Sequence, residues 1–153
     1  MIYTVRFAHL ADKPALRPGQ VLRRGDIVGR MGNTGQSTAA HLHLDVVEGM
    51  QHGRYTLGDI ANGKPLASAK QAMFFVDAEL FGVKPEITTH FADPEYYAKL
   101  GKLHLGYDLV PIDRRETDKH FDIHWNRSAL GRVVNIMVDD PGYGNCAMIA
   151  FEG

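Results

Sequence analysis

Residues 39–49 read AAHLHLDVVEG and combine two patterns in one short segment. Leucine and histidine alternate here as side chains do in a β-strand, where successive residues point to opposite faces. Leu42 and Leu44 therefore face one side, where a hydrophobic core is expected. His41 and His43 share the other side, with their Cβ atoms about 6–7 Å apart. Two neighbouring histidines have no evident role in a hydrophobic core, so this strand is predicted to carry a functional site.

The composition is that of an ordinary globular protein. The chain has 153 residues, of which 44% are hydrophobic and 23% charged, and this fits one domain with its own core. Its formal net charge is −1, whereas nucleic-acid-binding proteins usually carry a basic excess. We therefore expect no nucleic-acid partner. No apolar run approaches the roughly 20 residues of a membrane span, so no membrane span is expected either.

The first ten residues, MIYTVRFAHL, do not have the features of a secretion signal. Such a signal has a basic segment, a long apolar stretch and a cleavage site with small residues. We therefore expect synthesis in the cytoplasm. The chain has a single cysteine, Cys146, which excludes an internal disulfide and a thiolate zinc cluster.

Strand-like and glycine-rich segments alternate along most of the chain. Short alternating or β-branched runs bounded by glycines predict strands, and these fall at 2–10, 20–30, 41–47, 102–111, 130–140 and 145–151. Apolar residues recur at three- and four-residue steps between Pro65 and Gly82, which predicts a helix at about 66–81. A helical turn is expected in FADPEYYAKLG. The sequence thus predicts a mainly β fold with one helix in its middle.

A second candidate for chemistry is the segment HLGYD at residues 104–108. His104 and Asp108 lie on one face of the alternation, but a straight strand separates them by about 13 Å, too far to share a metal ion. Gly106 could supply a β-bulge that brings them together. Zinc takes imidazole and carboxylate ligands, usually three from the protein in a catalytic site. The residues alone leave the third ligand open among the other histidines, which include His9, His41 and His43.

Several of these segments together resemble one family, the lysostaphin-type (LytM-like) zinc endopeptidases, which cut peptide bonds in bacterial peptidoglycan. GNTGQSTAAHLHLDV is similar to the family's glycine-serine-threonine loop and His-x-His strand. HLGYDL resembles its first metal motif, His-x-Gly-x-Asp, and VRFAHL resembles the segment with a further active-site histidine. LGRVVNIMVDDPGYGNCAMI is similar to the strand–turn–strand between them. Because three motifs and the segments next to them all match, the resemblance to this family is specific.

This resemblance implies a role for each matched residue. His104, Asp108 and His43 would bind one Zn²⁺ per chain. His41 and His9 would be catalytic histidines close to the metal but not bound to it. We favour His41 as the general base and His9 as the group that stabilises the oxyanion, and the two roles can be exchanged.

Two positions depart from the family pattern. Ala39 and Ala40 stand where the family usually has Gly-Pro. This difference removes no chemical group from the site. Asp45 stands where glutamate is common, and we assign it no role from the sequence.

The motifs occur in a circularly permuted order, because the half that comes last in the family comes first here. The resemblance assigns residues 1–48 to the C-terminal half of the family fold and 86–153 to its N-terminal half. Residues 49–85, with the predicted helix, would bridge the two halves within one metallopeptidase domain, 1–153. The implied fold is therefore an antiparallel β-sheet sandwich, circularly permuted, with one inserted helix.

The function that the resemblance implies is zinc-dependent hydrolysis of a cross-link or stem-peptide bond, with peptidoglycan peptide as the substrate. The alternative is a non-catalytic relative that binds the cell wall or has a regulatory role. Such relatives lose metal ligands, whereas all five positions are filled here. With no secretion signal, we expect a phage lysis enzyme that reaches the cell wall or periplasm by phage-mediated release. The oligomeric state and the bond that is cut stay open.

Overall fold

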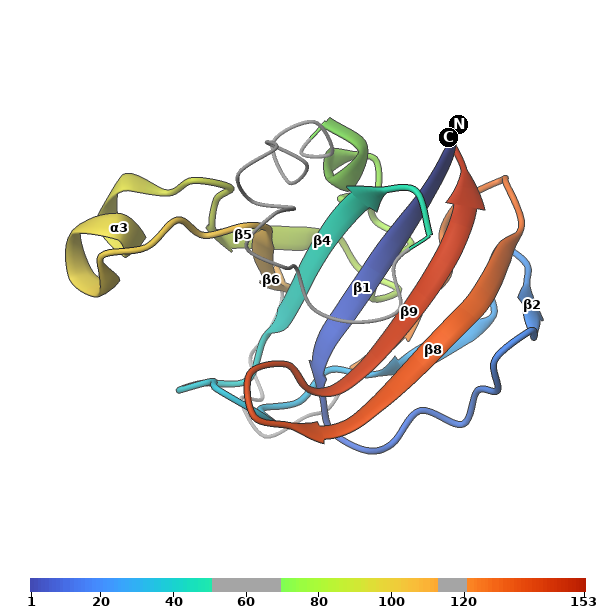
Figure 1. Ribbon diagram of the computed structural model, residues 1–153. Helices are drawn as coiled ribbons and strands as arrows, with labels where there is room; N and C mark the ends of the chain where they lie inside the picture. Colours follow the sequence, from blue (N-terminus) through green and yellow to red (C-terminus); the bar gives the residue numbers. More distant parts are fainter. Residues whose placement is uncertain (51–69, 113–120) are drawn as a thin grey trace.

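Two antiparallel sheets make up most of the computed structural model, which describes residues 1–50, 70–112 and 121–153. The larger sheet has seven strands in the order β2-β8-β9-β1-β4-β6-β5, and the smaller pairs β3 with β7 (Figure 1). The mainly β prediction is confirmed. The strands are β1 (Ile2–Leu10), β2 (Val21–Leu22), β3 (Ile27–Arg30), β4 (Leu42–Glu48), β5 (Pro85–Thr89), β6 (Tyr107–Pro111), β7 (Asp122–His124), β8 (Gly131–Asp140) and β9 (Gly144–Glu152).

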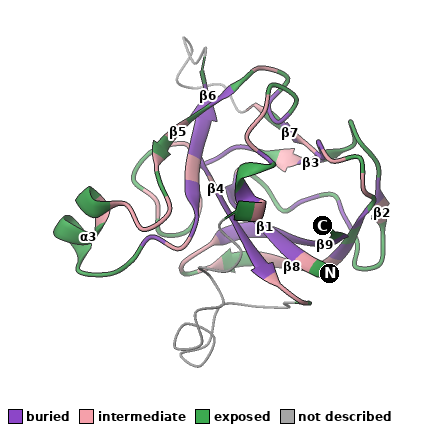
Figure 2. Cartoon of the chain, turned by 90° about the horizontal axis from the view of Figure 1, so that it is seen from above, coloured by how far each residue is buried: buried purple, intermediate pink, exposed green. Residues whose placement is uncertain are grey.

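The hydrophobic core lies on one face of the large sheet. On β4, Leu42 and Leu44 are fully buried and point into this core, as their alternation with histidine predicts. The smaller sheet and the rings of Phe75 and Trp125 cover the same face. Figure 2 shows the central strands as buried along most of their length. The other face of β4 is left for His43 and its neighbours.

The two ends of the chain lie side by side in the sheet. Strands β1 and β9 pair antiparallel from Ile2 opposite Glu152 to Phe7 opposite Ala147. The backbone N–H of Gly153 donates to the carbonyl oxygen of Met1 at 3.1 Å, and Figure 1 shows the two termini together. The pairing joins the first and last strands of the chain as neighbours, like the arms of a hairpin.

Two glycines let the loop after β3 pack against the turn between β8 and β9. A Cβ atom on Gly35 would lie 2.3 Å from the backbone nitrogen of Gly144, and one on Gly144 would lie 2.4 Å from Thr34. Thr34 also donates through Oγ1 to the carbonyl oxygen of Leu10 at 2.6 Å. The predicted loop therefore has a fixed place next to the end of β1, which carries His9.

The helix predicted at about 66–81 is confirmed at 70–73 and wrong beyond residue 73. Residues 66–69 lie outside the described residues, and the helical residues 70–73 are followed by turns. The N–H groups of Phe74, Phe75 and Val76 each donate to a carbonyl three residues earlier. These turns bring Phe75 and Leu80 into the core, both fully buried, whereas Met73 of the predicted apolar face is 43% exposed.

The helical turn expected in FADPEYYAKLG is a short helix, α3 (Pro94–Leu100). Asp93 caps it by accepting hydrogen bonds from the N–H groups of Glu95 and Tyr96, and Pro94 fits the first turn, where no N–H bond is lost. Gly101 ends the helix with a left-handed φ of 68°. The helix has no buried residue and stands out from the sheet (Figures 1 and 2).

Some segments differ from their predicted extent. Strand β6 begins at Tyr107 instead of 102, and β5 and β7 were not predicted because they are short and polar. The division into 1–48, 49–85 and 86–153 stays a prediction, and residues 51–69 of the bridging segment lie outside the described residues. Among the described residues, no helix has both the length and the apolar character that a membrane crossing needs.

Candidate metal centre

The centre begins with a pair of residues directly opposite each other on β4 and β6. His43 and Asp108 are register partners in this antiparallel pair, and such partners place their Cβ atoms about 4.5–5.5 Å apart on one face. The Nδ1 atom of His43 lies 3.2 Å from Oδ1 of Asp108. Sheet pairing therefore brings together two residues that are far apart in the sequence.

His104 joins this pair from the segment just before β6. Its Nε2 atom lies 3.1 Å from Oδ1 of Asp108, although a straight strand would hold the two residues far apart. The predicted bulge at Gly106 does not account for this, because His104 is not part of the strand. The irregular backbone of 103–106 turns the imidazole back toward Asp108 instead.

Gly106 is needed for a different reason, which is close approach of two backbones. A Cβ atom at this position would lie 2.7 Å from the carbonyl oxygen of Leu44 and 2.8 Å from Cε1 of His43. Real Cβ atoms essentially never come so close to backbone. The glycine in the His-x-Gly-x-Asp motif thus allows the His104 segment to lie against β4 beside His43.

We expect Gly106→Ala to separate the two ligand segments. Overpacking of this kind costs about 1–3 kcal/mol of the free energy of unfolding, and the displaced histidines should bind zinc less tightly. Chemical denaturation and zinc titration would measure both effects. Gly29→Ala is the matched control, since its new Cβ meets only the flexible end of Leu10. An unchanged zinc affinity in Gly106→Ala would contradict this interpretation.

The donor atoms of His43, His104 and Asp108 suit a single metal ion. All three lie within 4.8 Å of one another, and zinc bonds of about 2.0–2.2 Å place tetrahedral ligand atoms roughly 3.5 Å apart. The other ring nitrogen of each ligand histidine is already hydrogen-bonded to the protein. Nδ1 of His104 donates to the carbonyl oxygen of His90 at 3.0 Å, which leaves Nε2 of His104 free to bind a metal. The donor set therefore fits zinc.

An ion pair behind His43 was not predicted from the sequence. The Nε2–H of His43 donates to Oδ2 of Asp45 at 2.9 Å, and Nε of Arg6 donates to Oδ1 of Asp45 at 2.6 Å. Arg6 and Asp45 are 0% and 1% exposed, so the bonds hold a buried carboxylate against the imidazole. With Nε2 held on Asp45, Nδ1 is the ring nitrogen of His43 that faces Asp108 and that would give its lone pair to a bound metal ion.

Electrostatics in the centre favour an ionised carboxylate beside charged histidine. Burial opposes the charge on Asp108, but hydrogen bonds from His104, His41 and His43 hold the pKa of this carboxyl well below its usual value. Burial likewise disfavours charge on His43, yet its bonds to Asp108 and Asp45 raise the pKa of His43 to about 9. The surroundings thus stabilise a positive charge at the position where a metal cation would be bound.

The two predicted catalytic histidines lie beside this group. Nε2 of His41 is 3.5 Å from Oδ1 of Asp108, and Nδ1 of His41 donates to the carbonyl oxygen of Ala39 at 2.8 Å. The ring centroid of His9 lies 4.9 Å from that of His41 and 6.0 Å from that of His43. All five residues named from the sequence therefore meet in one place.

His9 is held in an unusual backbone conformation. A bulge interrupts the β1–β9 pairing between Phe7 and Leu10, and His9 has a left-handed φ of 62°, which is uncommon for a residue other than glycine. Its Nδ1–H donates to the carbonyl oxygen of Thr34 at 2.7 Å. Burial, together with the charges on His41 and His43, lowers the pKa of His9 to about 4, so this imidazole is neutral at neutral pH.

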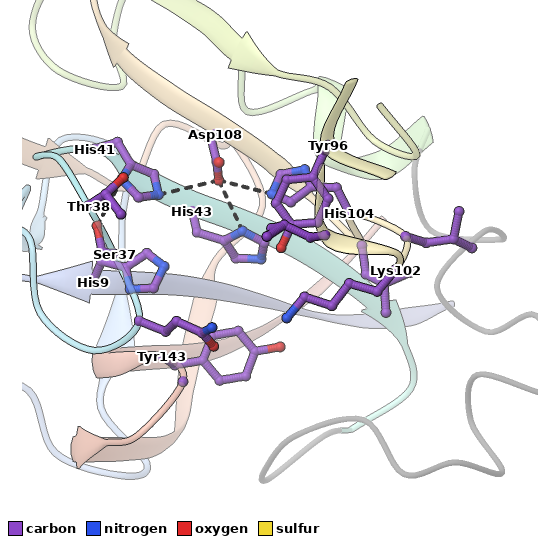
Figure 3. Close-up of a pocket in the computed structure, with 15 residues that line it drawn as sticks. His9, Ser37, Thr38, His41, His43, Tyr96, Lys102, His104, Asp108 and Tyr143 are labelled. Carbon is purple, nitrogen blue, oxygen red and sulfur yellow. Dashed lines mark hydrogen bonds and ion pairs between the residues drawn. The ribbon is translucent and has the colours of Figure 1, made fainter. Parts of the chain in front are cut away.

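The histidines and Asp108 line an open pocket of about 580 Å³. The loop residues Ser37 and Thr38 form one side, and Tyr96 and Lys102 form the other, with Tyr143 below in the view of Figure 3. A pocket of this kind leaves space for an extended peptide to pass over the histidines. Fold and site together therefore define a mainly β protein with a His–His–Asp group suited to a metal ion in an open groove.

Comparison with known proteins narrows this class. Residues 2–56 match Peptidase family M23. The chain is also 30% identical to peptidoglycan DD-endopeptidase ShyB of Vibrio cholerae serotype O1 over 80 residues, which are 52% of this chain and 18% of that relative. The chain thus spans less than a fifth of the length of the relative. No solved structure matches the chain significantly. The predicted resemblance to the LytM-like peptidoglycan endopeptidases is confirmed.

Proposed function

We propose that this chain is a zinc-dependent endopeptidase that hydrolyses a peptide bond in bacterial peptidoglycan. The observation that carries the proposal is the meeting of His43, from the segment that matches the peptidase family, with His104 and Asp108 from outside it. Two further histidines lie beside this group in the same pocket. The relative is a peptidoglycan DD-endopeptidase, and this supports a peptide substrate of the same kind.

Each group in the pocket has a part in this chemistry. Zinc held by His43, His104 and Asp108 would supply a bound water with a pKa near 7 and would polarise the scissile carbonyl. Since Nδ1 of His9 donates to Thr34, its Nε2 carries a lone pair that can accept a proton from the attacking water. His41, whose Nε2 lies 3.5 Å from Oδ1 of Asp108, would in its protonated form donate to the oxyanion or the leaving amine.

These roles reverse the assignment that we favour from the sequence, in which His41 is the base and His9 stabilises the oxyanion. A histidine with a pKa of about 4 is a poor source of positive charge at neutral pH, which argues against His9 as a protonated stabiliser of the oxyanion. The support for a proton acceptor is geometric, since the bond from Nδ1 to Thr34 leaves Nε2 of His9 as the acceptor nitrogen in the pocket. We therefore propose His9 as the base and His41 as the stabilising group.

We also infer that the chain is a circular permutant of the family fold. The family match ends at residue 56, while the His-x-Gly-x-Asp motif follows at 104–108. The pairing of β1 with β9 supports this, since joining Gly153 to Met1 would close a β-hairpin. Hairpin turns are places where chains tolerate being cut. A role in phage lysis, with action on cell-wall or periplasmic peptidoglycan, stays a prediction.

Digestion of purified peptidoglycan tests the proposed activity. The zinc-loaded protein, the same protein after chelation, and the chelated protein after zinc is restored would each act on diaminopimelate-type and glycine-bridged walls. We expect new amine and carboxyl ends in the mass spectra of the fragments only when zinc is bound. Stoichiometric zinc with no cleavage of either wall would contradict the proposal, and wall binding without cleavage would favour the non-catalytic alternative.

A further inference from the structure

One wall of the pocket combines an apolar surface with a positive charge. Leu100 and Leu103 line this wall and are 56% and 46% exposed, which leaves their side chains open to a ligand. Lys102 lies between them in sequence and also lines the pocket. In Figure 3 its side chain extends into the pocket, with the amine directed toward the space beside His43 and Tyr143.

The charge of Lys102 is not balanced within the pocket. Among the lining residues that the structure describes, Asp108 alone carries a carboxylate. Its Oδ1 atom faces His41, His43 and His104. Among those same described residues, no acidic group lies within ion-pair distance of Lys102. A divalent cation at the centre would add more positive charge. The pocket therefore favours a ligand that brings a negative group of its own.

Contacts between His104 and the segment around α3 hold Lys102 close to the metal centre. The ring of Tyr96 on α3 packs on His104 with centroids 4.6 Å apart, and the N–H of Ala92 donates to the carbonyl oxygen of His104 at 2.8 Å. Lys102 follows α3 and precedes His104 by two residues. A group bound by its amine would thus lie close to the bond that the centre acts on.

We propose that Lys102 binds a carboxylate of the substrate next to the scissile bond, and that the apolar wall packs on the aliphatic chain of the same substrate residue. This proposal rests on the proposed function. Diaminopimelate in a D-alanyl cross-link supplies both features, since the carbon that bears the acylated nitrogen also bears a carboxylate, and three methylenes follow it. A bond within a glycine bridge supplies neither. The substrate class is therefore a carboxylate-bearing cross-link.

Cleavage of matched substrates tests the carboxylate contact. Two cross-linked muropeptide dimers would be compared, one with the free diaminopimelate carboxylate and one with that carboxylate amidated. The proteins are the parent chain, Lys102→Met, which keeps length without charge, and Lys102→Arg, which keeps charge. Lys99→Met is the matched control, because Lys99 is exposed on α3 and does not line the pocket.

We expect Lys102→Met to lower kcat/KM on the free-carboxylate dimer about 10-fold, a typical effect of losing a charge-assisted hydrogen bond. Amidation should lower the parent's kcat/KM by a similar factor, and Lys102→Met should lose no more on the amidated dimer. Lys102→Arg should keep most of the activity, and Lys99→Met should match the parent. Equal losses for Lys102→Met on both dimers would overturn the proposal, as would faster cleavage of glycine bridges than of the free-carboxylate dimer.

A binding measurement separates this proposal from the proposed function. The dissociation constants of both dimers would be measured by calorimetry with metal-depleted protein, in which no cleavage occurs. Tighter binding of the free-carboxylate dimer, lost in Lys102→Met, would support the contact even if the zinc-loaded chain cut no wall. Cleavage by the parent with no preference between the dimers in either assay would overturn the contact and leave the proposed function standing.

Discussion

Asp108→Asn is expected to remove peptidoglycan cleavage below detection and to release zinc. Oδ1 of Asp108 is the atom that His41, His43 and His104 all face, at 3.5, 3.2 and 3.1 Å. Asparagine has nearly the same shape but no negative charge, so it is a poor partner for a metal cation. Residues that only orient metal ligands are worth about 10–100-fold in metal affinity, and we expect this proposed ligand to exceed that range.

The measurement combines zinc content after dialysis, peptidoglycan digestion and circular dichroism. The fold should persist, because Asp108 lies on the face of the sheet away from the core and its side chain is 15% exposed. Asp122→Asn is the matched control, since Asp122 is an exposed strand residue of β7 outside the pocket. If Asp108→Asn kept stoichiometric zinc and full cleavage, the assignment of the metal centre would be wrong.

Much of the sheet could be predicted because its signals are local. Segments 2–10, 41–47, 130–140 and 145–151 alternate or end in glycine turns, and all four are strands in the structure. The helix predicted at 66–81 ends at residue 73 in the structure. Apolar residues three and four apart predict one buried face of a helix, but Met73 of that face is 43% exposed and the turns bury Ala72 and Phe75 instead.

The candidate site divides in the same way between local and long-range information. The motifs named His9, His41, His43, His104 and Asp108, and the fold brings all five together. Arg6 and Asp45 were missed because a charge on an alternating strand normally indicates a solvated face. Only the register of β1 on β4, which places Arg6 opposite Asp45, shows that the two charges form a buried pair. The sequence of neither strand alone indicates this register.

The buried pair behind His43 leads to the second large expected effect. Asp45→Ala should lower the free energy of unfolding by about 3–5 kcal/mol, because removal of one partner leaves a buried charge on Arg6 without its carboxylate. Burial alone would raise the pKa of Asp45, but Arg6 and His43 hold it below its usual value, so the carboxylate is charged in the folded protein. Chemical denaturation of the metal-free protein would measure this loss of stability.

Asp45→Ala should also weaken zinc binding about 10–100-fold, the usual cost of losing a partner that orients a metal-bound histidine. The double variant Arg6→Met/Asp45→Asn separates the two effects. It removes both buried charges while the asparagine oxygen can still accept the Nε2–H of His43, so stability and part of the zinc affinity should return. Asp12→Ala is the control, since the Asp12–Arg30 pair is exposed and such pairs contribute about 0–1 kcal/mol. Unchanged zinc affinity in Asp45→Ala would show that the pair supports the fold and has no part in orienting His43.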